Sequence, residues 1–424
     1  MTPDRDSAEE PKIPEFVQTA RAQIEELDRW QQITQEEARL AYEMTLRNEL
    51  SGGSRTVRDF ERRWRELTRS RYAITTLNGS SALYSAYFGA GVGPGDEVLC
   101  PSYTWISTIA PALFLGARPV FCESDPRTMM VDPEDIRRRV TERTRAIVAV
   151  HLWGWVCDMD AIMAIARERG LKVIEDCSHA HGATYKGRSV GSIGDVGCWS
   201  LQGSKPVSAG EGGILATDDP EIFDRACLAG QVNRIVGTDI VQEKYRPLQP
   251  LGLGMKFRSH PLGIGIASVQ LHKLPALNAR RGAYVAEVEA GLGEVAGLEP
   301  VLSSPGSERG GYYGFPMRYV PEEAGGAPVE KMIEAINRAG VPANPSPYQP
   351  LHRLPLFEKG FDLFTRNRGP LSGDYRGYTE GDLPVTERMV ANLIFLPMLS
   401  EPVPGAARLI VEALKRAGEI LRNM

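Results

Sequence analysis

LKVIEDCSHAHGATYKGRSVGSIGDVGCWSLQGSKPVSAGEGG, residues 171–213, is the stretch that decides the fold. A short apolar run at 173–174 leads into an acidic pair that ends in Asp176. This pattern is typical of a buried strand whose carboxyl end opens onto a ligand crevice. Lys205 follows a second strand-like run at 196–201 and precedes a loop rich in glycine and serine. The two side chains can therefore meet in one small site.

Around this stretch, strand-like and helical patterns alternate along the chain. The strand-like runs are 72–77, 97–100, 119–122, 145–151, 172–175, 196–200 and 213–217, and helical patterns cover 80–91, 104–115, 133–140, 159–169 and 220–230. Such alternation predicts an α/β fold with a doubly wound, mainly parallel sheet. In such sheets ligands bind beyond the carboxyl ends of the strands.

Three parts of the chain are predicted. Residues 60–290 form the large domain, and residues 291–424 form a smaller C-terminal α/β domain with one strand and two helices. Helices in residues 1–59, one of them at 16–27, are expected to pack with the small domain. Between the helix at 220–230 and residue 254 lies a long polar loop without clear periodicity, and loops of this length in compact domains are usually functional or lie at interfaces.

Composition excludes several classes of function. Of the 424 residues, 42% are hydrophobic and 24% are charged, and the net charge is −5, with no dense basic patch for nucleic acid. No apolar run approaches the roughly 18 residues of a membrane span. The N-terminus lacks the apolar core of a signal peptide. The six cysteines are scattered and form no CxxC pair, which favours reduced thiols in a cytoplasmic protein.

The pair in the central stretch suits pyridoxal 5'-phosphate (PLP). A lysine amine, here Lys205, can hold the aldehyde as a Schiff base. A carboxylate, here Asp176, can keep the pyridine nitrogen protonated so that the ring accepts electrons. Taken alone, the pair is weak evidence, because a surface lysine and a strand-end aspartate are more often solvated bystanders. No metal site is predicted.

The surrounding residues resemble a known family. Four segments are similar to the DegT-type nucleotide-sugar and aminocyclitol aminotransferases: IEDCSHAHGA, GSIGDVGCWS, SK and GEGG. The similarity runs, with gaps, from about Gly52 to the C-terminus. It implies a fold-type I PLP-dependent transferase that moves an amino group from L-glutamate or L-glutamine to a keto-sugar or keto-cyclitol, in secondary-metabolite or cell-surface sugar biosynthesis. It also implies a homodimer with shared active sites, in which the 231–260 segment crosses over.

The turn at Gly79-Ser80-Ser81 is predicted to hold the cofactor phosphate. Gly79 allows close backbone approach, and the first N–H groups of the following helix carry the positive end of its dipole. The family usually has S-G-T at this turn. The resemblance also implies that Ser200, five residues before Lys205, forms a hydrogen bond with the phosphate. A serine that merely caps the helix explains the turn as well.

Two residues are expected at the cofactor ring. Trp105 corresponds to the family's aromatic residue that lies flat on the ring, although a core position would also suit it. His179 stands where the family usually has Gln, within reach of the ring hydroxyl.

The C-terminal half contributes four candidates by resemblance. Lys256 replaces the family's Asn that reaches the phosphate of the neighbouring subunit, and a lysine can pair with phosphate as a point charge. Arg258 is expected to bind a carboxylate of the donor or substrate. Tyr348 and His352, in Y-Q-P-L-H, are expected near the substrate, although a structural turn accounts for this segment equally well.

Two alternatives from other classes remain. A PLP-dependent sugar dehydratase shares the scaffold but is expected to carry histidine in place of the lysine. A catalytically silent regulatory or binding relative would lose the lysine and aspartate pair. Lys205 argues against the first and the presence of both Lys205 and Asp176 against the second.

Overall fold

A seven-stranded sheet lies at the centre of the computed structural model, which describes residues 26–233, 240–249 and 251–423. The strands are β1 (Tyr72–Thr76), β2 (Glu97–Pro101), β3 (Arg118–Cys122), β4 (Thr144–Val150), β5 (Lys172–Asp176), β8 (Val196–Ser200) and β9 (Gly213–Thr217). Their order is β1-β9-β8-β5-β4-β2-β3, and β9 is antiparallel to both of its neighbours whereas the other pairs are parallel. The predicted large, mainly parallel sheet is confirmed.

Helices bury this sheet. They are α3 (Arg55–Thr68), α4 (Gly79–Gly89), α5 (Ala110–Phe114), α6 (Pro133–Arg139), α7 (Met159–Arg169), α8 (Pro220–Gly230) and α9 (Pro261–Ala290). Helix α4 packs across β8 and β9, and α7 packs on β4 and β5. Strands β2 and β9 are buried along their whole length, which explains why they read as short continuous runs rather than as alternating patterns.

The helix predicted at 104–115 is divided. Trp105 is extended, a 3-10 turn, η1, covers Ile106–Thr108, and α5 begins only at Ala110. Pro111 stands in the first turn of α5, where its missing N–H costs no hydrogen bond, so the sequence starts a new helix there. The division matters because it leaves the 104–108 segment free to line a pocket.

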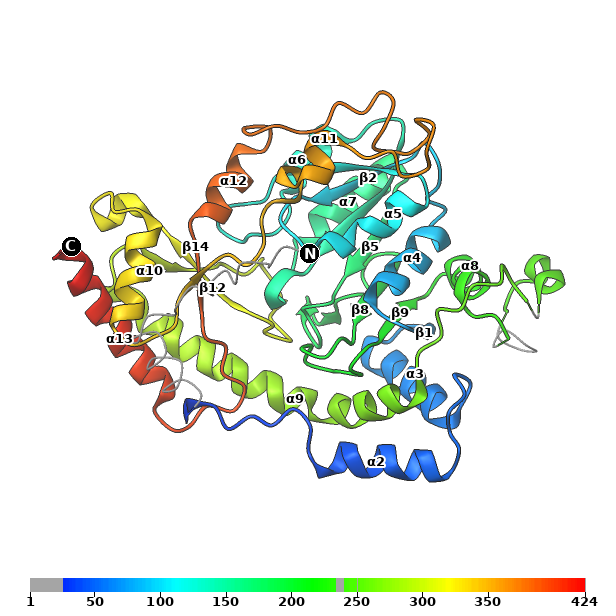
Figure 1. The fold of residues 1–424 in the computed structure, drawn as a ribbon, viewed down its shortest axis with the longest axis horizontal. Coiled ribbons are helices and arrows are strands. Elements are labelled where there is room, and N and C mark those ends of the chain that lie inside the picture. Colours follow the sequence, from blue (N-terminus) through cyan, green and yellow to red (C-terminus); the bar gives the residue numbers. More distant parts are fainter. Residues whose placement is uncertain (1–25, 234–239, 250, 424) are drawn as a thin grey trace, which may run out of the picture.

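A second, smaller domain follows α9 (Figure 1). Its antiparallel sheet has the order β10-β12-β14-β13, with β10 (Leu298–Pro300), β12 (Phe315–Tyr319), β13 (Asn344–Pro345) and β14 (Leu393–Leu396). Helices α10 (Val329–Arg338) and α13 (Ala406–Arg422) pack beside it and share its separate hydrophobic core. Further short elements are β6 (Thr184–Tyr185), β7 (Arg188–Ser189), β11 (Ser307–Glu308), α11 (Pro355–Lys359) and α12 (Pro384–Ala391).

The packing of the two ends of the chain differs from the predicted domain limits. Helix α2 (Gln35–Leu46) lies along α9, and α3 adds Phe60 and Trp64 to the core of the large domain. Of the N-terminal 59 residues, the segment around Asp28 contacts the small domain. The helix predicted at 16–27 lies almost entirely outside the described residues. Part of the C-terminal third, including Leu351 and Phe357, packs against the large core.

The segment after α8 contains one short element among its described residues, the 3-10 turn η3 (Glu243–Leu248). Residues 234–239 of the predicted loop lie outside the described part of the chain. Among the helices that the structure describes, none is both long and apolar enough to cross a membrane.

Candidate active site

A cavity of about 490 Å³ opens at the carboxyl ends of the parallel strands, between the large domain and segments from the C-terminal third. Its described lining comprises Asn78, Gly79, Ser80, Leu83, Thr104, Trp105, Ser107, Thr108, Val150, Leu152, Asp176, Ser178, His179, Ser200, Gln202, Ser204, Lys205, Glu211, Tyr313 and Tyr348. The volume falls in the usual range for small-molecule sites. This is also the edge of an α/β sheet at which ligands bind.

Asp176 ends β5 and is 5% exposed. Its Oδ2 accepts a hydrogen bond from the Thr108 hydroxyl at 2.7 Å, and its Oδ1 accepts one from the backbone N–H of Ser178 at 3.2 Å. The Thr108 hydroxyl is itself 3.0 Å from that of Thr104. Two fixed donors therefore orient the carboxylate and leave it able to accept a further hydrogen bond from a ligand in the cavity.

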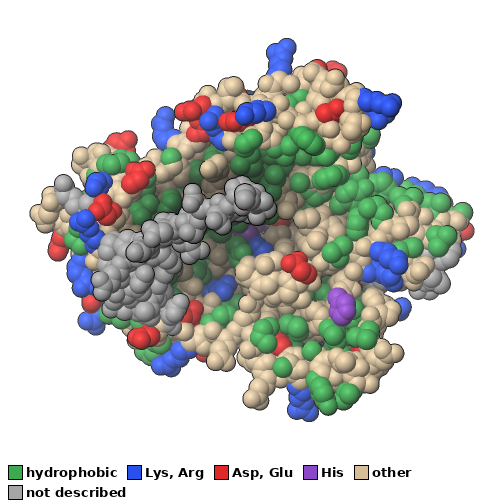
Figure 2. All heavy atoms as spheres, viewed as in Figure 1, with side chains coloured by type: hydrophobic (Ala, Val, Ile, Leu, Met, Phe, Trp, Pro, Cys, Tyr) green, Lys and Arg blue, Asp and Glu red, His purple; other side chains and the backbone are tan. Residues whose placement is uncertain are grey.

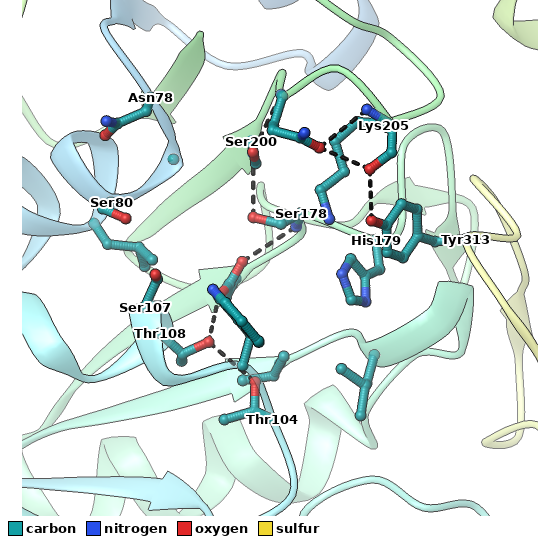
Figure 3. A pocket seen from close by; sticks show the side chains of 18 of the residues that line it. Asn78, Ser80, Thr104, Ser107, Thr108, Ser178, His179, Ser200, Lys205 and Tyr313 are labelled. Carbon is teal, nitrogen blue, oxygen red and sulfur yellow. Dashed lines mark hydrogen bonds between the residues drawn. The ribbon is translucent and has the colours of Figure 1, made fainter. Parts of the chain in front are cut away.

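Lys205 lies in the loop after β8 and reaches into the same cavity (Figure 3). Its Nζ is 3.6 Å from the ring centroid of Tyr313, and the Tyr313 hydroxyl is 2.7 Å from the Ser204 Oγ. Burial lowers the pKa of Lys205 from 10.5 to about 8, although the negative charge of Asp176 acts in the opposite direction. At pH 7 about a tenth of the amine is then neutral and nucleophilic, compared with less than a thousandth at the ordinary pKa of 10.5.

His179 faces the cavity as a neutral ring. The backbone N–H of Trp153 donates to its Nδ1 at 3.3 Å, and the ring stacks on Tyr313 with centroids 4.1 Å apart. Burial, followed by the positive charge of Lys205, holds the pKa of His179 well below its usual range. Because Nδ1 is an acceptor, the proton of the neutral imidazole resides on Nε2, which can donate to a ligand.

The amino end of α4 forms another wall. Asn78 caps the helix by accepting a hydrogen bond from the Ser81 N–H at 2.8 Å. A Cβ on Gly79 would lie only 2.9 Å from the Cβ of Ser200, so this close approach of helix and strand requires glycine. Gly79, Ser80 and Ser200, which are predicted to hold the phosphate, all line the cavity. The predicted phosphate ligand Ser81 does not: its hydroxyl donates to the Asn78 carbonyl at 2.8 Å and serves the cap.

Trp105 and Tyr348 also line the cavity. Trp105 is 54% exposed, and its ring centroid is 5.4 Å from that of Tyr348 in a tilted arrangement. Tyr348 also stacks on Trp153, with ring centroids 4.8 Å apart. Trp105 and Tyr348 therefore give the cavity an aromatic side next to its polar groups, with Trp153 packed behind Tyr348.

His352, which the sequence analysis expects near the substrate, is fully buried and is not among the described residues that line the cavity. Its Nδ1 is 2.6 Å from the Ser102 hydroxyl and its Nε2 is 2.7 Å from the Glu387 carboxylate. These bonds tie the end of β2 to α12. A hydrolytic Ser-His-acid triad is not formed, since Ser102 is 0% exposed and unable to meet a substrate.

Lys256 and Arg258 are also absent from the cavity wall that this single chain builds from its described residues. Lys256 is exposed, and its backbone pairs with Gln231. The Arg258 side chain packs close to Gly52, where a built Cβ would be 3.3 Å from the Cβ of Arg258. Both residues lie within the 231–260 segment that the family resemblance predicts to cross between subunits.

Sequence reasoning missed two residues at the centre of the site. Tyr313, just before β12, contacts both Lys205 and His179, but nothing local in G-G-Y-Y-G predicts that contact. Thr108 orients Asp176 from a segment read as an apolar helix. Its polar side chain among Ile and Ala neighbours was the available signal.

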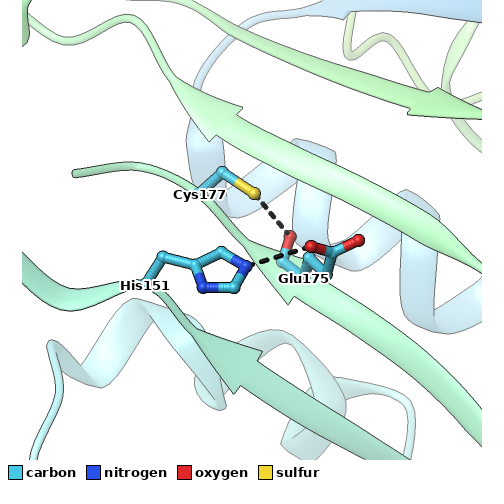
Figure 4. A group of neighbouring side chains, drawn as sticks. All are labelled: His151, Glu175 and Cys177. Carbon is cyan, nitrogen blue, oxygen red and sulfur yellow. Dashed lines mark hydrogen bonds and ion pairs between the residues drawn. The ribbon is translucent and has the colours of Figure 1, made fainter. Parts of the chain in front are cut away.

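A group of possible metal ligands lies behind the site: His151, Glu175 and Cys177, all fully buried (Figure 4). Their donor atoms are already engaged. His151 Nε2 bonds Glu175 at 3.0 Å, and Nδ1 accepts the Cys157 N–H at 3.2 Å. Glu175 also accepts the backbone N–H groups of residues 191, 193 and 194. The group therefore has a structural role, because Glu175 binds the turn at residues 191–194 to the end of β5.

Comparisons with known proteins agree with this geometry. The model of the DegT/DnrJ/EryC1/StrS aminotransferase family matches residues 31–415. The L-glutamine:scyllo-inosose aminotransferase of Streptomyces griseus is 35% identical over 301 residues, which are 70% of this chain and 71% of that protein. The L-glutamine:2-deoxy-scyllo-inosose aminotransferase of Streptoalloteichus tenebrarius is 32% identical over 355 residues, 81% of this chain and 82% of that protein.

Among solved structures, the aminotransferase from Psychrobacter cryohalolentis superposes with a TM-score of 0.81 at 29% identity, covering 94% of this chain and 100% of that one. The resemblance inferred from residues 171–213 is thus confirmed over nearly the whole length. The chain belongs to the DegT/DnrJ/EryC1/StrS aminotransferase family and is a PLP-dependent aminotransferase.

Proposed function

We propose that this enzyme transfers an amino group from L-glutamine to the ketone of a cyclitol, with L-glutamate as the alternative donor and a keto-sugar as the alternative acceptor. Relatives that are named for L-glutamine and an inosose cover 70–82% of their own and this chain's length in the two comparisons above. The reaction would serve aminocyclitol or amino-sugar biosynthesis. Buried cysteines that form no disulfide within the described part of the chain support a cytoplasmic location.

One observation carries the assignment: Lys205 and Asp176 line the same cavity as the amino end of α4. The residues present fit PLP. The N–H groups at the start of α4, with Ser80 and Ser200, would hold its phosphate, and glycine at position 79 lets Ser200 lie close to that helix end. His179 Nε2 would donate to the ring hydroxyl.

When bound, PLP supplies an aldehyde that receives the amino group and a ring that withdraws electrons. The protein supplies the proton movements. Lys205 Nζ would hold the cofactor covalently and, once released, take the α-proton of the donor, for which a pKa of about 8 suits it. The Asp176 carboxylate would keep a proton on the ring nitrogen. Trp105 would cover the ring, and Tyr348 would contact the substrate.

A homodimer with shared active sites is part of the proposal. Exposed apolar side chains gather on α2 and on the segment after α8, regions where hydrophobic atoms are prominent in Figure 2. They include Tyr42 (65% exposed), Leu46 (69%), Leu251 (63%) and Leu253 (55%). Such a surface favours association with a second copy. Lys256 and Arg258, which follow this segment, would reach the partner's cavity to bind phosphate and a substrate carboxylate.

An acceptor screen tests the proposed function. Enzyme converted to the pyridoxamine form with L-glutamine is offered keto-cyclitols and nucleotide keto-sugars separately, and the return of the aldehyde form is followed by absorbance. A keto-cyclitol should restore it fastest. Return with nucleotide keto-sugars alone would reassign the acceptor, and failure of L-glutamine and L-glutamate to form pyridoxamine would refute transamination.

A further inference from the structure

Residues 27–34 form a strap between the small domain and the loop that carries Lys205. At its first end, the Asp28 carboxylate accepts hydrogen bonds from the backbone N–H groups of residues 400 and 401, at 2.9 and 2.7 Å. At its other end, Gln32 Nε2 donates to the backbone carbonyl of Lys205 at 3.1 Å. A surface segment far away in sequence therefore holds the main chain of the lysine.

Gln270, on α9, forms hydrogen bonds with both the strap and the lysine loop, and it is only 2% exposed. Its Nε2 donates to the Gln32 carbonyl at 3.1 Å, and its Oε1 accepts the Ser208 N–H at 2.7 Å. Two amide side chains thus hold the lysine loop at residues 205 and 208. Buried amides with both groups paired are rigid, because breaking either bond leaves an unsatisfied polar atom.

A second connection leads from the same small-domain turn to the other side of Lys205. Arg281 donates to the Ser400 hydroxyl at 2.7 Å and to the Gly311 carbonyl at 2.6 Å. Two residues beyond Gly311, the Tyr313 ring lies against the lysine amine. The turn at residue 400 is therefore linked to the backbone of Lys205 through the strap and to its amine through Tyr313.

We propose that Gln32 is a positioning residue for Lys205, and that the strap makes the position of this lysine depend on the small domain. The inference rests on the proposed role of Lys205. During transamination the lysine amine must occupy two positions in turn, bonded to the cofactor and beside the α-proton, while its backbone stays in place. A displacement of about 1 Å at such a group can cost on the order of 10²-fold in rate.

Gln32→Met tests the proposal in PLP-loaded enzyme, since it keeps the size of the side chain and removes the N–H donor. Gln31→Met, at the exposed neighbouring position, is the matched control. Stopped-flow absorbance gives the maximal rate and apparent affinity for L-glutamine in the donor half-reaction. A pH titration of the absorbance of the Lys205–PLP link reports its geometry independently of turnover.

We expect Gln32→Met to slow the maximal rate about tenfold without weakening L-glutamine binding, and to move the titration midpoint. Gln31→Met should match the wild type. Gln32→Glu, which presents a carboxylate to the Lys205 carbonyl, should show the same loss even if Gln32→Met folds poorly. Asp28→Asn, at the far end of the strap, should act in the same direction with a smaller effect.

Identical rates and titrations for Gln32→Met and Gln31→Met would overturn the positioning role. Wild-type behaviour of Asp28→Asn alone would overturn the dependence on the small domain. Neither result touches the proposed function, which fails separately if PLP in the wild-type enzyme forms no borohydride-reducible link to Lys205.

Discussion

Replacing Asp176 with asparagine removes a charge from the active site while keeping its shape. The carboxylate accepts from the Thr108 hydroxyl at 2.7 Å and from the Ser178 N–H at 3.2 Å. The new amide oxygen can keep the Ser178 bond. The Thr108 hydroxyl can turn to donate to Thr104, 3.0 Å away, and accept from the new NH₂ group. Stability should therefore fall by no more than about 1 kcal/mol.

The effect on catalysis should be larger than the effect on stability. A hydrogen bond from a protonated ring nitrogen to a carboxylate is charge-assisted, and the amide at position 176 can offer only a neutral one. At a site that is 5% exposed, that difference is worth about 3 kcal/mol, or on the order of 10²-fold in the donor half-reaction. The whole of this difference should appear as a loss of rate, because the Asp176 carboxylate stabilises mainly the charge that develops in the transition state.

Stopped-flow absorbance of PLP-loaded Asp176→Asn with L-glutamine measures this loss, and a melting curve measures stability. Asp59→Asn, on the partly exposed face of α3 outside the described lining, controls for the loss of one negative charge. Near-normal rates in Asp176→Asn that retains its cofactor would remove the carboxylate from the mechanism. A lowered melting temperature with an unchanged rate would show that Asp176 only supports the fold.

The lowered pKa of Lys205, about 8, predicts that covalent PLP attachment to cofactor-free protein accelerates as pH rises towards 8 and levels off above it, which rapid mixing at successive pH values measures. Between pH 8 and pH 10.5, approximately, Lys205 binds more protons in the unfolded chain than in the folded one. The contribution of Lys205 to the free energy of unfolding of cofactor-free protein should therefore rise with pH in this range. Denaturant titrations in which this contribution falls with pH would contradict the prediction. Tyr313→Phe should keep this pH profile, whereas Tyr313→Ala should move it upward because the amine gains water; equal profiles would remove the ring from the account. His352→Gln should lower the free energy of unfolding by about 2 kcal/mol and leave kcat of the folded enzyme nearly unchanged, and a selective loss of kcat would return His352 to the substrate site.

The sequence predicts the sheet and the central pair because both depend on local patterns. Asp176 and Lys205 each follow a strand-like run, and the carboxyl ends of parallel strands meet at one edge of the sheet, so two local readings combine into one site. The start of α4 is predictable for a similar reason, since a Gly-Ser turn between a strand and a helix exposes N–H groups.

Contacts made through tertiary packing are not predictable in this way. Tyr313 meets Lys205 because α9 and the small domain return the chain to the cavity, and Gln32 meets it from the opposite end of the sequence. The burial of His352 was not predictable either. A histidine in a recognisable segment suggests chemistry, yet tertiary structure places its ring between Ser102 and Glu387 in the interior. Pro111 gave a usable sign that the 104–115 helix is divided.

The central claim, that Lys205 is the residue that carries the cofactor, is tested most directly by borohydride reduction followed by peptide mapping. The wild-type enzyme loaded with PLP is reduced, digested and examined by mass spectrometry for the phosphopyridoxyl group. We predict that the group is found on Lys205, and that Lys205→Ala still binds PLP through the α4 end and Asp176 but gives no reduced adduct. Stoichiometric labelling of a different lysine, or an unchanged adduct in Lys205→Ala, would contradict the account.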